Sequence, residues 1–337
     1  VLDNIGVPFW LTVPSMVVLI WLYTRKGGIK TLVWTDTFQT LCMFAALLLI
    51  IYKVTGQLGM TPTEAFAAIS QDEHSRIFVF DDWVSRQNFW KQFLSGIFVV
   101  IVMTGLDQDM MQKNLTCKTL REAQKDMCSY GFAFVPANLL FLSLGVLLMM
   151  LAKSQGMALP EKPDDLLPMF AASGALGSMV TVFFTIGVVA ASFSSADSAL
   201  TALTTSVCVD IFGRDEDEDL RKKVHLAVAM VFMLFIIGFG ALNSTSVIDA
   251  IYILCSYTYG PLLGLFAFGL MSHRKVNDRW VPWICIASPL ICFAVDTLTM
   301  QFTGYKFGYE LLMLNGALTF AGLALSGIGQ EVKELRS

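Results

Sequence analysis

The chain has 337 residues, of which 55% are hydrophobic and only 15% are charged, whereas a soluble domain carries roughly 25% charged residues. This composition excludes an ordinary water-soluble globular protein. The formal net charge of −4 and the pI near 5.4 leave no basic surface for a nucleic acid, so that class of partner is excluded as well.

Nine apolar segments follow one another along the chain, at residues 7–24, 31–53, 92–109, 127–152, 175–208, 224–242, 247–271, 281–300 and 308–328. Most have the length of about 20 residues that a helix needs to cross a hydrocarbon core. The segment 175–208 is too long for a single span, so we expect it to bend or to project from the membrane. The sequence therefore predicts an all-α polytopic protein that crosses a lipid bilayer about nine times.

The basic residues predict which side each loop faces. Sixteen of the 23 Lys and Arg residues lie in short loops and a tail on one side, at 25–30, 112–126, 212–223, 272–280 and 329–337. By the positive-inside rule these segments are cytoplasmic, which places the first residues of this chain outside and its C-terminal tail inside.

The longest loop on the opposite side, residues 54–91, is predicted to be extracellular. Within it, Thr61-Pro62-Thr63-Glu64 precedes a short amphipathic stretch and predicts a capped helix. Such a helix can cover an extracellular vestibule or lie on the lipid headgroups, and both interpretations stay open.

Two acidic residues, Asp36 and Asp197, lie well inside apolar segments. An ionisable side chain in hydrocarbon costs at least a few kcal/mol, so each of them needs a partner or a function. Five further acids lie near the ends of segments, where we expect solvated or helix-capping roles: Asp107, Asp109, Asp210, Asp249 and Asp296.

Asp197 belongs to the densest polar cluster of any apolar segment. Ala191, Ser194, Ser195 and Ser198 recur at helical spacing and share one face. Such columns of small residues often serve only close helix packing. A carboxylate in the same turn favours a second interpretation, because hydroxyl, carbonyl and carboxylate oxygens are the ligands of a small hard cation.

Three stretches resemble a known family, the solute:sodium symporters. A-A-S-F-S-S-A-D-S-A-L at 190–200, running on to V-D-I-F at 209–212, is similar to its signature helix. G-G at 27–28 with W-T-D-T-F-Q-T at 34–40 resembles its G-G…T-D-x-x-Q segment. G-L-D-Q at 105–108 with Q-K at 112–113 resembles its G-x-(N/D)-Q-x-x-x-Q-(R/K) element.

The resemblance implies an inverted-repeat fold of the LeuT type, in which five helices are repeated upside down. The nine segments then correspond to the last nine of thirteen helices. Because the chain opens at Val1 without a Met, we expect residues 1–337 to be one transporter domain that is incomplete at its N-terminus.

The resemblance also implies the site. The carbonyl of Ala191 and the hydroxyls of Ser194 and Ser195 should supply half of the main Na⁺ site, and the other half belongs to a helix that is absent from this chain. Some members hold a second Na⁺ with an acid equivalent to Asp36 and two hydroxyls. Asp197 and Ser198 stand at the positions of those hydroxyls, so an Asp replaces the first of them.

The solute is less accessible. Sugar-carrying members have an Asn and a Tyr at the positions of Val100 and Met103, so a sugar is not supported. Three tyrosines before Gly260-Pro261 are expected either to line the pocket or gate or to serve as interfacial anchors: Tyr252, Tyr257 and Tyr259.

These observations predict a sodium-coupled symporter of a small organic solute in the cytoplasmic membrane of a bacterium, with Na⁺ as coupling ion and no enzymatic chemistry. The alternatives are a solute-sensing module of a signalling protein and, with less support, a channel. A serine hydrolase would need a general base near the serines, but the histidines of this chain lie in loops or at segment ends, and its sequence contains no G-x-S-x-G motif. The seven cysteines are expected to be small buried apolar side chains.

Overall fold

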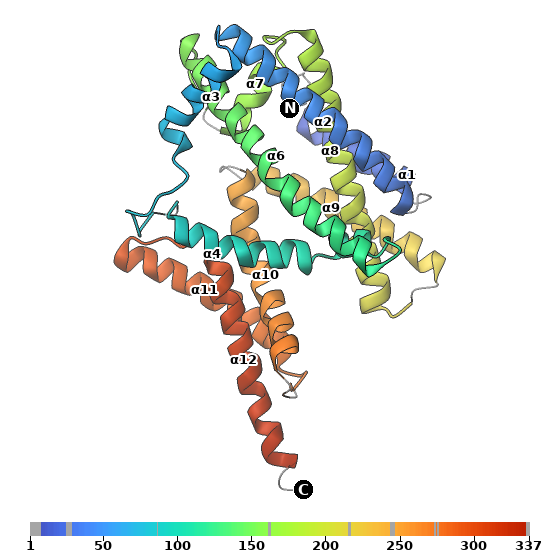
Figure 1. Ribbon diagram of the computed structural model, residues 1–337. Helices are drawn as coiled ribbons and strands as arrows, with labels where there is room; N and C mark the ends of the chain where they lie inside the picture. The colour runs from blue at the N-terminus through green and yellow to red at the C-terminus, as the bar shows by residue number, and fades with distance from the viewer. Residues whose placement is uncertain are drawn as a thin grey trace. The chain divides into compact units, whose positions relative to one another are not determined.

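The computed structural model describes residues 8–24, 29–85, 87–160, 163–214, 217–242, 247–272, 274 and 276–334 (Figure 1). Within these ranges, the side chains of residues 23, 29–35, 242, 247–250 and 328–334 are not described. The motif glycines Gly27 and Gly28, the side chain of Asp249 and the last three residues of the tail therefore lie outside the described part.

The described residues form helices and loops and contain no strand. The α-helices are α1 Phe9–Thr24, α2 Ile29–Gln57, α3 Pro62–Gln71, α4 Phe89–Val100, α5 Gln108–Asn114, α6 Leu120–Ser154, α7 Leu166–Ala171, α8 Ser178–Thr205, α9 Glu218–Leu242, α10 Val247–Met271, α11 Val281–Thr303 and α12 Leu311–Glu334. Every predicted apolar segment overlaps one of the longer helices, which confirms the all-α prediction.

Six helices of the described residues are long and apolar enough to cross a membrane: Asp36–Gln57, Leu120–Ser154, Ser178–Ile211, Glu218–Ala241, Ile251–Met271 and Val281–Thr303. A seventh candidate is the pair Phe89–Gly105 and Gln108–Asn114, which is bent by 60°. The predicted segments at the two ends appear as shorter apolar helices, Phe9–Leu22 and Leu311–Gly327.

Two of these spans are interrupted by π-helical turns. The turn Ile101–Gly105 continues α4, and the turn Ser206–Ile211 continues α8. With its π turn, the α8 span has 34 residues, which at 1.5 Å per residue exceeds the hydrocarbon thickness of about 30 Å. The over-length predicted for this segment is thus confirmed. Single π turns inside helices occur frequently at functional sites.

The predicted capped helix in the loop 54–91 is present as α3. The Thr61 hydroxyl accepts a hydrogen bond from the Glu64 N–H, and the Glu64 carboxylate accepts one from the Thr61 N–H at 2.7 Å. Donation from the Thr61 backbone and hydroxyl holds the pKa of Glu64 below its ordinary value. This reciprocal capping explains why a helix begins here. Its position outside the cell stays a prediction.

The described residues divide into two compact units. Unit 1 comprises residues 1–75 and 112–246, and unit 2 comprises residues 76–111 and 247–337. The prediction of a single transporter domain stays a prediction.

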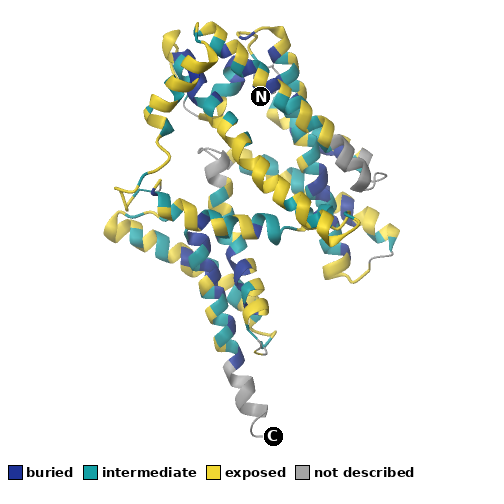
Figure 2. Cartoon of the chain, viewed as in Figure 1, coloured by how far each residue is buried: buried dark blue, intermediate teal, exposed yellow. Residues whose placement is uncertain are grey.

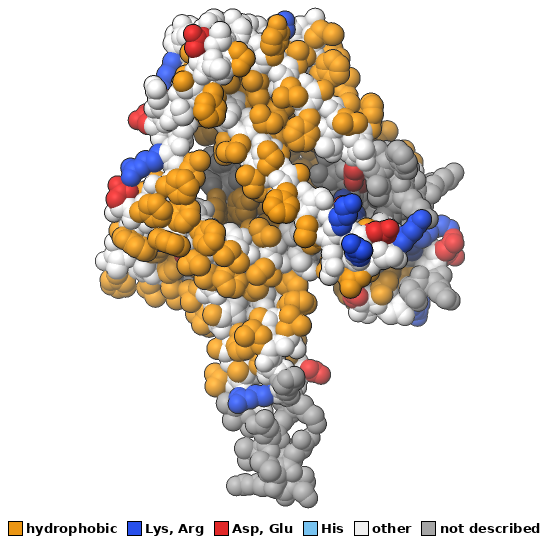
Figure 3. All heavy atoms as spheres, in the orientation of Figure 1, with side chains coloured by type: hydrophobic (Ala, Val, Ile, Leu, Met, Phe, Trp, Pro, Cys, Tyr) orange, Lys and Arg blue, Asp and Glu red, His pale blue; other side chains and the backbone are white. Residues whose placement is uncertain are grey.

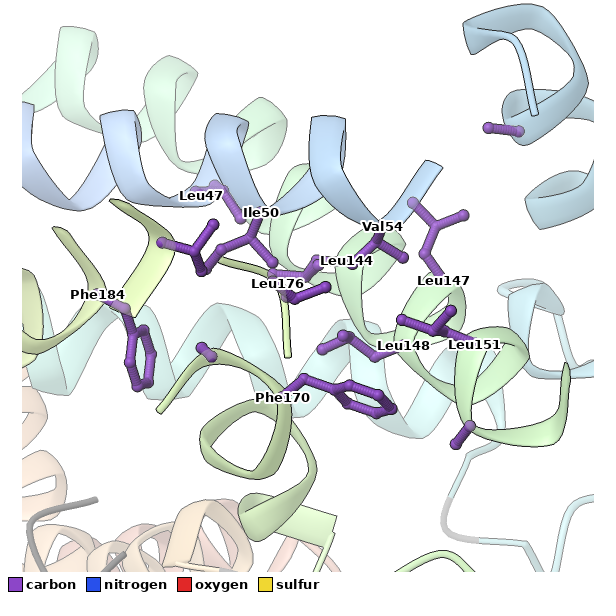
Figure 4. Packing of buried hydrophobic residues seen from close by; sticks show 14 residues of the cluster. Leu47, Ile50, Val54, Leu144, Leu147, Leu148, Leu151, Phe170, Leu176 and Phe184 are labelled. Carbon is purple, nitrogen blue, oxygen red and sulfur yellow. The ribbon is translucent and has the colours of Figure 1, made fainter. Parts of the chain in front are cut away.

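Unit 1 has an apolar core between α2, α6, α7 and α8, shown in Figure 4. Ile50 of α2, Leu148 of α6 and Phe170 of α7 are each 1% exposed, and Phe184 of α8 packs into the same cluster. A second cluster in the same unit joins α1, α8 and α9 around Leu200. Helix α8 is therefore packed from two sides within unit 1.

In unit 2, α10 and α12 pack closely because glycines of α10 lie against α12. A Cβ atom at Gly260 would lie 2.2 Å from the Asn315 side chain, and one at Gly264 would lie 2.5 Å from Thr319. Small residues four apart that let two backbones approach are typical of membrane helix pairs.

Large apolar side chains also cover much of the outer surface. Phe132 is 83% exposed and Phe302 is 82% exposed. Exposed positions run along most helices in Figure 2, and in Figure 3 apolar side chains dominate the visible face while charged ones gather in small groups. This distribution suits hydrocarbon as the surrounding solvent.

Candidate cation site

The candidate site lies in unit 1, where α2 packs against α8. Gly187 of α8 allows this approach, since a Cβ there would lie 3.6 Å from the Met43 side chain of α2. One turn before Met43 on α2, the amide of Gln39, oriented so that both of its ends find partners, donates to the Ala190 carbonyl at 2.9 Å and accepts from the Ala191 N–H at 3.3 Å. The two polar stretches that the sequence singled out are therefore neighbours.

Asp36 of α2 is the centre of the polar contacts. Its Oδ1 accepts a hydrogen bond from the Ser194 hydroxyl of α8, and its Oδ2 lies 3.5 Å from the Lys113 ammonium of α5. The side chain of Asp36 is 26% exposed and that of Lys113 is 32% exposed. The two carboxylate oxygens thus contact two different elements.

Asp197 and Ser198 are buried on the same helix. Asp197 is 0% and Ser198 is 3% exposed, and within hydrogen-bonding geometry neither Asp197 oxygen nor the Ser198 hydroxyl has a partner among the described residues. A buried polar group without a partner costs several kcal/mol. Such groups are therefore available to a ligand that brings its own positive charge.

The remaining residues of the predicted main site lie on the same stretch of α8. Ala191 is half-buried and borders a cavity of about 220 Å³ between α2, α6, α7 and α8, while Ser195 is exposed. The structure brings Asp36 of the predicted second site together with Ser194 of the predicted main site. Among the described residues it shows no hydrogen bond between Asp36 and the side chain of Asp197 or Ser198.

The predicted substrate residues all lie in unit 2. Val100 is 59% exposed, and Met103 lies half-buried in the π turn after α4. The three tyrosines of α10 are half-buried and contact other helices and loops. The ring centroid of Tyr252 lies 4.7 Å from that of Tyr309 and the ring centroid of Tyr257 lies 6.4 Å from that of Phe293, both in tilted pairs, and Tyr259 packs near Val102 and Leu312.

Of the acids near segment ends, Asp107 has the expected helix-capping role, whereas Asp296 bonds to a loop. Asp107 Oδ1 accepts from the backbone N–H groups of Asp109 and Met110 at the start of α5, at 3.0 and 3.2 Å. Asp296 Oδ1 accepts from the Phe307 N–H at 3.0 Å. These carboxylates stabilise the start of α5 and the loop after α11, and they are not part of the polar cluster on α8.

Sequence reasoning assigned no role to His225, which the structure shows buried on α9. Its Nε2 lies 2.9 Å from the Thr24 hydroxyl of α1, and its Nδ1 lies 3.0 Å from the Thr204 hydroxyl of α8. Both ring nitrogens therefore have hydrogen-bond partners, and His225 links α9 to α1 and α8. His225 is thus not positioned as a general base for the serines at 192–198, which argues against the hydrolase alternative.

Asn315 of α12 was also missed. Pro261 lacks the N–H that would bond to the Tyr257 carbonyl within α10, and the Asn315 side-chain amide donates to that carbonyl at 2.8 Å and to the Ser256 carbonyl at 3.0 Å. Its own oxygen accepts from the Ser288 hydroxyl at 2.7 Å. No local signal marks this residue, because its partners lie 27 to 59 positions away.

Among the described residues, several helices are long enough to cross a membrane, a carboxylate and a hydroxyl meet between α2 and α8, and buried oxygens on α8 lack partners. Such intramembrane polar groups are typical of ion-coupled membrane transporters. The family model described as "Sodium:solute symporter family" matches residues 2–279. The chain belongs to this family, and the family resemblance carried by the three motifs is confirmed.

Individual relatives are also sodium-dependent or sodium-coupled transporters by name. The chain is 26% identical over 278 residues to the sodium-dependent multivitamin transporter of Oryctolagus cuniculus, covering 79% of this chain and 43% of that protein. It is 25% identical to the sodium-coupled monocarboxylate transporter 2 of Mus musculus, covering 79% of this chain and 44% of that protein. The chain thus spans less than half the length of these relatives.

A solved structure of a Na⁺-coupled sialic acid symporter, in a substrate-bound outward-open state, matches with a TM-score of 0.71 at 18% identity. The match covers 96% of this chain and 67% of that one. This similarity confirms the expected fold.

Proposed function

We propose that the protein to which this chain belongs is a sodium-coupled symporter of a small organic solute in a cytoplasmic membrane. One observation carries the proposal: on α8, Ser194 contacts the Asp36 carboxylate, and one turn later Asp197 and Ser198 present buried oxygens that have no partner in the described part of the chain. Oxygen donors of these kinds suit a hard cation stripped of its water.

The residues fit Na⁺ in two groups. Ala191, Ser194 and Ser195 would contribute to a main site, and Asp36, Asp197 and Ser198 would contribute to a second one. The cation would supply the positive charge that balances the buried Asp197 carboxylate, and Ala191 would place the main site beside the cavity that it borders. Sodium entering down its gradient contributes about 2.3 kcal/mol per charge and 100 mV.

For the solute, we propose a class other than sugars, because Val100 and Met103 offer no hydrogen-bonding group of the kind that a sugar requires. The matched relatives are named for vitamins and monocarboxylates. Tyr252, Tyr257 and Tyr259 would line the pocket or gate. We also propose a bacterial host membrane and a cytoplasmic C-terminus, the latter on the distribution of Lys and Arg.

The proposal predicts that uptake of the right solute by vesicles containing the intact protein depends on sodium. A screen of carboxylates, vitamins and amino acids in sodium medium against choline medium is expected to give at least one solute whose initial uptake rate rises severalfold with sodium. Uptake that is equal in the two media would contradict symport. Binding without uptake would instead favour the alternative of a solute sensor.

The second carboxylate of the site predicts a pH effect. If both carboxylates serve one cation site, replacing Asp197 changes the negative charge that holds the cation and that protons can compete for. The Asp197→Ser variant of the intact protein is expected to change the number of sodium ions per solute or the pH profile of uptake. An unchanged stoichiometry together with an unchanged pH profile would contradict this role.

A further inference from the structure

The ammonium of Lys113 contacts the carboxylate at the centre of the candidate cation site. Lys113 lies in the last turn of α5, and its Nζ is 3.5 Å from Asp36 Oδ2, while Asp36 Oδ1 is occupied by the Ser194 hydroxyl. The lysine therefore takes the one carboxylate oxygen that is not already bonded to α8.

The geometry of this ion pair suits exchange rather than permanent pairing. A tight charge-assisted hydrogen bond has an N–O distance of about 2.7–2.9 Å, so 3.5 Å is loose. Both side chains are also partly accessible, at 32% for Lys113 and 26% for Asp36, which lets water or an ion reach the carboxylate.

A lysine ammonium resembles Na⁺ in its charge and its hydration. It is a compact, strongly hydrated single positive charge on a flexible stem. When the cation leaves, the carboxylate of Asp36 would otherwise stand uncompensated in a membrane segment, at a cost of a few kcal/mol. A tethered ammonium keeps the site close to neutral in the empty carrier as well as in the loaded one.

We propose that Lys113 is a tethered competitor of the coupling cation: its ammonium binds Asp36 when the site is empty and is displaced when the cation binds. Lys113 lies in the segment 112–126 that the positive-inside rule assigns to the cytoplasm, so the competition would assist release of the ion on that side. This inference rests on the proposed symport function.

The test is equilibrium sodium binding to the intact protein in detergent, with ionic strength held constant by choline. Lys113→Gln removes the competitor and is expected to lower the sodium concentration for half-maximal binding by about three- to tenfold, the effect of a coupling of about 1 kcal/mol. Lys113→Arg keeps the charge, and we expect it to stay within about twofold of wild type. Lys118→Gln is the matched control, because Lys118 lies in the same segment with an exposed side chain.

A measurement on the wild-type protein avoids any folding defect of the variants. Acetylation of lysines, followed by mass spectrometry, is expected to label Lys113 faster in sodium than in choline, with Lys118 unchanged. The inference would be overturned if Lys113 were labelled equally fast or more slowly in sodium. It would also be overturned if Lys113→Gln bound sodium with unchanged or weaker affinity. Sodium-dependent uptake in either case would leave the proposed function standing. Absence of any sodium dependence in the wild type would overturn both.

Discussion

Replacing Asp36 by asparagine in the intact transporter is expected to weaken sodium binding by about 100-fold and to reduce sodium-dependent uptake correspondingly. The substitution keeps the shape of the side chain and removes the negative charge that Ser194 and Lys113 contact. A hydrogen-bonded charge contributes about 1.5–3 kcal/mol, and about 1.4 kcal/mol corresponds to each factor of ten in affinity. The sodium concentration for half-maximal uptake is the quantity to measure.

Asp126→Asn is the matched control for this prediction, because Asp126 is an exposed acid near the start of α6. Its sodium dependence should equal that of wild type. If Asp36→Asn kept the wild-type sodium affinity while Asp197→Ser lost it, the cation would be held by the buried oxygens of α8 alone, and the assignment of Asp36 to the site would be wrong.

The largest expected effect on stability is that of Asn315→Leu in unit 2. Leucine branches at the same atom as asparagine but has a bulkier, apolar end, so three hydrogen bonds are lost and the tight contact beside Gly260 is strained. In membrane proteins such bonds average about 0.6 kcal/mol and reach about 1.7 kcal/mol. The Tyr257 carbonyl would in addition lose the donor that replaces the missing N–H of Pro261. We expect unfolding in mixed detergent micelles to require about 2–4 kcal/mol less free energy.

The matched control is Asn138→Leu. Asn138 is an exposed asparagine of α6 whose amide donates to the Phe134 carbonyl within its own helix, so this variant should change the free energy of unfolding by about 0.5 kcal/mol or less. An Asn315→Leu variant as stable as this control would show that another donor satisfies the α10 carbonyls. It would also remove Asn315 from the account of how α10 and α12 are held together.

Much of the fold could be predicted from the sequence, because the constraint that dominates a membrane protein is local. Backbone N–H and C=O groups in hydrocarbon find no water, and an α-helix satisfies nearly all of them internally, so runs of apolar residues such as 281–300 and 224–242 are predicted to be helical. The capped helix α3 was equally predictable, since Thr61 and Glu64 are three residues apart and bond to each other. The ends of the helices and the π turns within the spans were harder to predict from the sequence. The spacing of the apolar residues gives no signal of the π turn at Ile101–Gly105.

The sequence by itself determined the class of the protein, the helical character of its nine apolar segments, and the polar stretches around Asp36 and Ser194 as the place to look for a cation. Only the tertiary structure decided which groups meet there. It joined Asp36 to Ser194 and Lys113, left the buried oxygens of Asp197 and Ser198 without a partner among the described residues, and supplied the Tyr257 carbonyl with a donor from Asn315 in place of the missing N–H of Pro261. The physical reason is that helix formation depends on neighbours a few residues apart. Pairing of buried charges and carbonyls, by contrast, depends on how helices far apart in the chain pack, and a local pattern does not encode that packing.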